Sequence, residues 1–320
     1  MARGSEEAAT SGPPALSRLT LSLVGSVRPA DVGSIVARLR RARAEGVTSF
    51  DLVEAADPAL ARSLLARAFP EGDSAVVVIA PFESRHDPAP GSRAPSSRIP
   101  APALAVGEDL APRRSGAPEF ATVYESTRGG GMTTGMPARS DRAGRSPPGR
   151  PEILRCDSVD DLAGVPTAPS QVWVSGSHSL LEPGLLEAAS LRLGGGRLRW
   201  LGRDPFAGGR LDGSRFLSAG SMSAGVPVRT VRELESEFAP VARFGFLALP
   251  RRRTLAQAAL WYALDRPEVV SVCLPLPPPE RWEELLGFSR SPPLTEVERE
   301  RIRELDLSSG AGRPSAADGA

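Results

Sequence analysis

Short apolar runs alternate with helix-like stretches along most of the chain, and this alternation is the feature that most limits its fold. Runs of four to eight apolar or β-branched residues predict buried strands, and apolar residues at every third or fourth position predict amphipathic helices. Strict alternation of the two is typical of parallel βαβ units, because parallel strands need a crossover connection. The expected strands are 19–25, 47–53, 75–82, 120–126, 152–156, 171–176, 197–202 and 269–275.

Helix-like stretches lie between most of these runs. The first follows Asp31 and places Ile35, Val36 and Leu39 on one face. The others are 58–69, 182–193, 254–265, a short one around 279–287, and 295–306. Eight strands with helices between them over about 300 residues fit a (β/α)8 TIM barrel. A doubly wound sheet is the alternative, and it is less favoured because no G-x-G-x-x-G follows any expected strand.

The middle third of the chain departs from this pattern. Residues 83–150 are rich in Pro and Gly, which cost about 3 and 1 kcal/mol relative to Ala inside a helix. We therefore expect a barrel that is irregular or incomplete between its third and fifth strands. The expected organisation is a single barrel over 16–307, between disordered tails at 1–15 and 308–320.

Composition excludes several kinds of chemistry. All 39 basic residues are arginines, a bias that a genome rich in G and C explains. Schiff-base formation and catalysis by a lysine ammonium are excluded, because a guanidinium does not titrate in the working range. Two histidines and two widely spaced cysteines predict no metal site.

The net charge of +1 predicts no nucleic-acid partner and no anionic membrane surface. The chain starts without an apolar signal segment, and it has no apolar run long enough to span a bilayer. A cytoplasmic location is the expectation.

Four segments together resemble the aldo/keto reductase family, whose members are NADP(H)-dependent reductases built on a (β/α)8 barrel. Residues 42–69, "ARAEGVTSFDLVEAADPALARSLLARAF", are similar to the family's second-strand signature. "LGRDPFAGGRLDG" (201–213) resembles the loop after its seventh strand. "RRTLAQAALWYALDRPEVVSVCLP" (252–275) and "PPERWEELLGF" (278–288) resemble its last helix and strand and its cofactor-binding helix. The four lie in the family's order.

The resemblance implies a catalytic set that this chain has largely lost. In the family a Tyr hydroxyl gives a proton to the substrate carbonyl, a Lys paired with an Asp lowers the Tyr pKa, and a His orients the substrate. Asp51 matches the Asp, but Ala56 stands at the Tyr position and Pro81 at the Lys position. Glu125 or Ser126 stands where the His belongs. Asp51 is therefore interpreted as a relic at the barrel mouth.

Two other residues are candidate substitutes in catalysis. Tyr124 lies on the expected fourth strand and could replace the lost proton donor, although core or strand packing is the favoured role. His178 follows the sixth strand, where the family places residues near the nicotinamide, and its alternative is a structural role.

The cofactor positions are partly kept. The resemblance assigns NADP(H) contacts to Gly208, Gly209, Arg281 and Glu284, and it places Pro275 and Leu285 where the family has flexible or polar residues. A guanidinium can fork onto a 2′-phosphate, and glycines let the backbone approach a pyrophosphate. Proline, however, donates no backbone hydrogen bond. NADP(H) binding is expected to be weak or lost.

The leading hypothesis is a pseudoenzyme without family-type carbonyl reduction, which binds a small molecule or another protein in a binding or regulatory role. The alternative is an active NADP(H)-dependent oxidoreductase with a substituted active site, since hydride transfer needs only cofactor, orientation and an electrophile. A gene product with no selected activity is the third hypothesis.

Overall fold

The strands follow the chain order expected of a (β/α)8 barrel. The structure is a computed structural model that describes residues 16–23, 31–70, 75–81, 121–127, 152–165, 171–215 and 231–310. The sheet order is β1-β2-β3-β4-β5-β6-β7-β8, which confirms the predicted fold class. The strands are β1 (Leu19–Ser22), β2 (Ser49–Asp51), β3 (Val77–Pro81), β4 (Ala121–Thr127), β5 (Glu152–Arg155), β6 (Val172–Ser177), β7 (Leu198–Arg203) and β8 (Val269–Pro275).

The chain divides into two compact units, Met1–Arg155 and Cys156–Ala320. In the first unit the strands pair in parallel, β1 with β2, β2 with β3, β3 with β4 and β4 with β5. Every residue of β1 and β2 is buried, as expected of parallel strands that are covered on both faces. Their apolar members Leu19, Leu21 and Phe50 are buried together with the polar residues Thr20, Ser22, Ser49 and Asp51.

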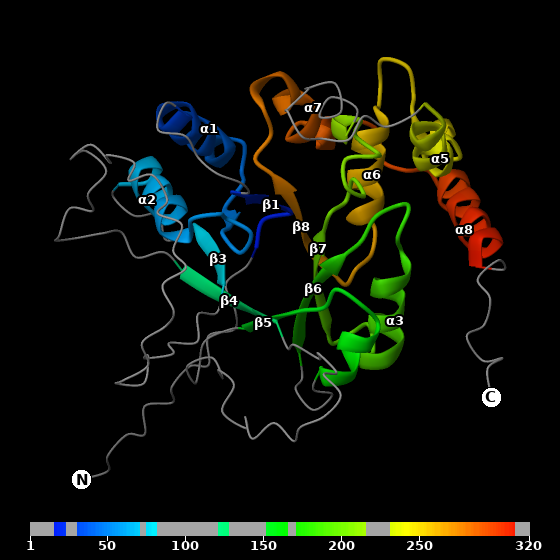
Figure 1. The fold of residues 1–320 in the computed structure, drawn as a ribbon, viewed down its shortest axis with the longest axis horizontal. Coiled ribbons are helices and arrows are strands. Elements are labelled where there is room, and N and C mark those ends of the chain that lie inside the picture. The colour runs from blue at the N-terminus through cyan, green and yellow to red at the C-terminus, as the bar shows by residue number, and fades with distance from the viewer. Residues whose placement is uncertain are drawn as a thin grey trace, which may run out of the picture. The chain divides into compact units, whose positions relative to one another are not determined.

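Two helices of the first unit, α1 (Val32–Ala44) and α2 (Pro58–Ala68), lie side by side (Figure 1). Helix α1 buries the stripe Ile35, Leu39 and Ala42. Helix α2 starts at Asp57, whose carboxylate accepts the Leu60 N–H at 2.9 Å. The Arg40 guanidinium of α1 donates to the carbonyl oxygens of Arg67 and Ala68, which satisfies backbone acceptors at the end of α2.

In the second unit β6, β7 and β8 pair in parallel. Trp200 of β7 is fully buried against Gly176 of β6. A Cβ atom on Gly176 would lie 2.8 Å from the Trp200 ring and 2.6 Å from the Cys156 carbonyl oxygen, so only glycine fits there. The helices of this unit are α3 (Gly184–Leu193), α5 (Val231–Ala242), α6 (Leu255–Ala263), α7 (Trp282–Leu285) and α8 (Glu296–Gly310), with short 3-10 helices at Asp160–Gly164, Gly245–Leu247, Pro279–Arg281 and Phe288–Arg290.

Arg253 ties several of these elements together. Its side chain is fully buried and donates to the carbonyl oxygens of Leu247, Pro292 and Pro293 at 2.9–3.1 Å. It also pairs with Glu298 at the start of α8. One guanidinium therefore joins the loop before α6 to the segment that leads into α8.

Helix α5 is the main element that the sequence analysis did not expect. It carries Pro240 near its end, where a proline removes a backbone hydrogen bond. Helix α8 runs to Gly310, into the stretch predicted as a tail. Within 83–150 the structure describes β4, and the rest of that region, like most of both predicted tails, lies outside the described residues. None of the described helices is both long and apolar enough to cross a bilayer.

Candidate functional site

Three neighbouring strand ends in the first unit carry the positions at which the resemblance places catalytic groups. Asp51 is the last residue of β2, is fully buried, and accepts the Val53 N–H on its Oδ1 atom at 3.1 Å. Pro81 ends β3 and lies in register with Glu125 of β4. Glu125 is 3% exposed. The acid predicted at the end of the second strand is therefore present, and the positions beside it carry a proline and a second buried acid.

The loop after β2 contains the position of the missing tyrosine. Ala56 lies in an exposed bend just before α2, so a methyl group stands where the resemblance requires a phenol. In the same loop the Glu54 carboxylate accepts a hydrogen bond from Arg155, the last residue of β5, at 3.1 Å. The arginine at this strand end is thus engaged by a carboxylate of the chain.

Tyr124 occupies the middle of β4. It lies in register with Ala80 of β3 and Glu152 of β5. Its side chain lies outside the described part of the structure, and its role as a substitute proton donor stays a prediction.

His178 follows β6 and packs into the interior of the second unit. Its backbone N–H donates to the Arg203 carbonyl at 3.0 Å, and its ring stacks on Tyr262 of α6 with centroids 5.3 Å apart. The side chain is 2% exposed, and neither ring nitrogen has a hydrogen-bond partner among the described residues. Burial lowers the pKa of His178 to about 4, so the ring is neutral near pH 7. This environment favours packing as its role, and its part in catalysis stays a prediction.

The loop after β7 has a left-handed backbone at its two adjacent glycines. Gly208 and Gly209 have φ angles of 67° and 83°, in the left-handed region. A Cβ atom on Gly209 would lie 2.4 Å from the Ser214 hydroxyl oxygen. The Gly208 N–H, which a bound anion would need, already donates to both carboxylate oxygens of Asp204 at 2.8 Å.

Arg281 lies between two carboxylates. Its Nη1 atom lies 2.5 Å from Asp212 Oδ2, and its Nε and Nη2 atoms donate to Glu284 Oε2 at 3.0 and 2.8 Å. The side chains of Arg281 and Asp212 are only 14% and 7% exposed. The structure thus brings together Arg281 and Glu284, which the sequence singled out, and adds Asp212, which it did not.

The two remaining positions that the resemblance assigns to the cofactor carry apolar residues, Pro275 and Leu285. Pro275 ends β8 and is exposed, whereas Leu285 is 3% exposed and packs in the core. Arg203 ends β7 nearly buried, with its Nη1 atom 3.9 Å from the Cys273 sulfur. The sequence analysis missed Arg203, Asp204 and Asp212, although all three lie in the 201–213 motif.

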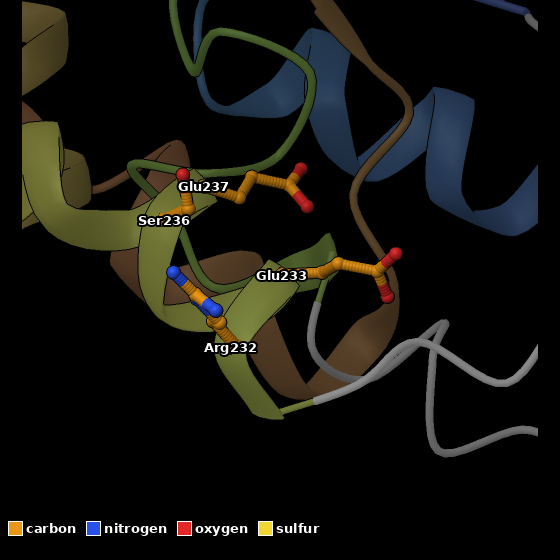
Figure 2. Close-up of a pocket in the computed structure, with 4 residues that line it drawn as sticks. All are labelled: Arg232, Glu233, Ser236 and Glu237. Carbon is orange, nitrogen blue, oxygen red and sulfur yellow. The ribbon is translucent and has the colours of Figure 1, made fainter.

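Two hollows lie elsewhere on the second unit. One of about 430 Å³ lies along α5 and is lined by Arg232, Glu233, Ser236 and Glu237 (Figure 2). The other, of about 680 Å³, lies beside the start of α6, and its lining includes Arg251, Arg252 and Glu284. Only the second contains a residue that the sequence assigned to a site. The described residues contain no group of three or more His, Cys, Asp or Glu side chains placed to hold a metal.

Comparison with known proteins identifies the fold through solved structures. A scan of protein-family models and a search of curated proteins each find no match. Among solved structures, the glycerol dehydrogenase AKR11B4 from Gluconobacter oxydans matches with a TM-score of 0.59 and 12% identity, over 98% of this chain and 99% of that chain. The aldo-keto reductase AKR11C1 from Bacillus halodurans matches in its apo form with a TM-score of 0.56 and 15% identity, over 91% and 92% of the two chains. The fold is that of the aldo/keto reductases.

At identities this low the likeness establishes the fold and leaves the activity to the residues. In this aldo/keto reductase fold, the described strand ends of the first unit offer carboxylates but no titratable cation. In the second unit, Arg281 and the Gly208 N–H, to which the resemblance assigns phosphate contacts, already bind carboxylates of the chain.

Proposed function

We propose that this protein is a pseudoenzyme of the aldo/keto reductase fold: it does not reduce carbonyls as the family does, and it acts by binding a small molecule or another protein. The observation that carries the proposal is the set of residues at the ends of β2, β3 and β4. Asp51 is buried there without a lysine, since the chain contains none, and Pro81 lies in register with buried Glu125.

This arrangement works against proton transfer from a phenol. A tyrosine with a pKa of about 10 needs a nearby cation to act as an acid near neutral pH. An ionised carboxylate at a neighbouring strand end would have the opposite effect, because a negative charge disfavours the phenolate and raises the pKa of a phenol. A substitute tyrosine would therefore be a poor acid at these strand ends.

The second unit also fits NADP(H) poorly. Arg281 and the Gly208 N–H, which the resemblance assigns to the cofactor, are paired with Asp212, Glu284 and Asp204. Weak or absent cofactor binding is consistent with a binding protein rather than a reductase. A cytoplasmic location stays part of the proposal.

The test is a reductase assay on the purified full-length chain. NADPH absorbance is followed with a panel of aldehydes and ketones, and the reverse reaction is followed with glycerol and NADP⁺. Loss of a general acid costs about 10²–10⁴-fold, so from an ordinary rate near 10 s⁻¹ we expect turnover below about 0.1 s⁻¹. Turnover of about 1–10 s⁻¹ would contradict the proposal and establish the active oxidoreductase instead.

A double variant serves as a further check. Ala56→Tyr with Pro81→Lys restores both missing groups, yet we expect no recovery of activity. The introduced lysine would lie in register with Glu125 and would pair with that carboxylate as well as with Asp51. Full recovery would show that the two lost side chains are the only obstacle.

A further inference from the structure

Arg281 is already engaged by carboxylates of the chain itself. All three of its donor nitrogens bond to carboxylates: Nη1 to Asp212, and Nε and Nη2 to Glu284. One guanidinium against two carboxylates leaves one net negative charge in this cluster. A phosphate monoester carries about −1.5 to −2 at pH 7, so the present arrangement repels the anion that a lone arginine would attract.

The carboxylate of Asp212 is itself held in place. Its Oδ1 atom accepts hydrogen bonds from the Ser214 N–H at 3.1 Å and from the Ser214 hydroxyl at 2.8 Å, which leaves Oδ2 for Arg281. The Asp212 side chain is only 7% exposed. It is therefore a built contact between the loop after β7 and the start of α7, 69 residues later in the chain, and not a loose surface pair.

A second anion-binding group in the same loop is filled in the same way. The Gly208 N–H points at both oxygens of the Asp204 carboxylate. Two independent groups that could receive phosphates thus hold side chains of the loop itself.

We infer that the Asp212 carboxylate binds Arg281 at the place where the phosphate of a nucleotide would bind. The same contact holds the loop 204–213 against α7. This Asp212–Arg281 ion pair sets the nucleotide selectivity of the site. The chain should discriminate against a dinucleotide that carries a 2′-phosphate, because binding it requires Asp212 to leave Arg281. This inference concerns binding alone, and it stands whether or not the protein reduces carbonyls.

The experiment compares NADPH and NADH, which differ only in the 2′-phosphate, on the full-length chain and on Asp212→Asn. Asparagine keeps an acceptor for Ser214 and removes the charge that faces Arg281. Binding is measured by calorimetry and by quenching of tryptophan fluorescence, for which buried Trp282 next to Arg281 is a local reporter. We expect Asp212→Asn to tighten NADPH binding about tenfold or more, because a like charge beside the phosphate is removed. NADH binding should change by less than about threefold.

Three further variants complete the design. Arg281→Ala in the Asp212→Asn background should abolish the increase in NADPH affinity. Asp265→Asn is the matched control, because Asp265 also receives two hydrogen bonds from one arginine, Arg299, at 2.7 and 2.8 Å, and it should leave both nucleotides unaffected. Should Asp212→Asn fail to fold by circular dichroism, Glu284→Gln removes the other carboxylate and should also favour NADPH.

The inference is overturned if Asp212→Asn binds NADPH no tighter than the parent chain does. It is equally overturned if the substitution increases the affinities for NADPH and NADH by the same factor. It is also overturned if the parent chain binds NADPH more tightly than NADH in a way that Arg281→Ala removes. Carbonyl reduction by the parent chain would contradict the proposed function and leave this result unchanged.

Discussion

His178 is enclosed in the second unit as a neutral ring. It stacks on Tyr262, is 2% exposed, and has its pKa lowered to about 4 by burial. A histidine whose folded-state pKa lies below the unfolded value of about 6.5 takes up its proton more readily in the unfolded chain. Its contribution to stability is therefore complete above about pH 6.5 and is lost as the pH falls toward 4.

We predict that His178→Phe removes this pH dependence. Phenylalanine can keep the stacking contact with Tyr262 and cannot titrate. Between about pH 7 and pH 5, the parent chain should lose about 2 kcal/mol more of its unfolding free energy than the variant. Urea unfolding of both proteins at the two pH values measures the difference. Equal losses would show that the ring is not buried as a neutral group.

The loop between β7 and α5 shows how a short element sets the geometry of a site. Residues 204–213 contain five backbone positions with positive φ: Asp204, Ala207, Gly208, Gly209 and Gly213. This conformation aims the Asp204 carboxylate at the Gly208 N–H and presents Asp212 to Arg281. The element is therefore shaped by backbone conformation more than by side-chain burial.

We predict different costs for two adjacent glycines of this loop. Gly208→Ala places a residue in the left-handed region, which costs about 1–2 kcal/mol, and its Cβ atom would meet nothing closer than 4.0 Å. Gly209→Ala carries the same strain and also a 2.4 Å clash with the Ser214 oxygen, so about 1–3 kcal/mol is added. Thermal unfolding of both variants tests the order, and equal melting temperatures would contradict it.

At the scale of the whole molecule, the fold is shared with proteins of low sequence identity. The solved structures match 91–98% of this chain with TM-scores of 0.55–0.59 at 12–15% identity. Parallel strands with buried faces need apolar side chains of suitable size, and many sequences supply them. A site instead needs particular groups at particular strand ends, so a shared fold does not by itself preserve a catalytic set.

Stability of the second unit depends on a buried arginine that joins separate elements. We predict that Arg253→Ala destabilises the chain by about 3–5 kcal/mol, because Glu298 and three carbonyl oxygens lose a buried donor. Arg299→Ala is the control: it breaks a partly exposed pair with Asp265 and should cost about 0–1 kcal/mol. Denaturant unfolding measures the unfolding free energy of both variants, and a similar decrease in the two would contradict the prediction.

The sequence by itself determined the strands and the residues that stand at the positions the resemblance assigns to catalysis. The eight predicted strands are all present, and Asp51 lies at the end of β2 as expected. The local composition predicts such strands because parallel strands are buried on both faces. The absence of lysine is a property of the chain that no fold can change. Arg281 and Glu284 were also singled out from the sequence, and in the structure they pair because residues three apart share a helical face.

Only the tertiary structure decided which groups those residues meet. Asp212 contacts Arg281 across 69 residues, and the His178 ring faces Tyr262 of α6. Local patterns carry no information on such pairs, because loop conformation and helix packing bring them together. Whether Arg281 is open to a phosphate or closed by Asp212 depends on the direction in which one loop turns. That direction follows from left-handed backbone angles and close approaches that are visible only in the folded chain.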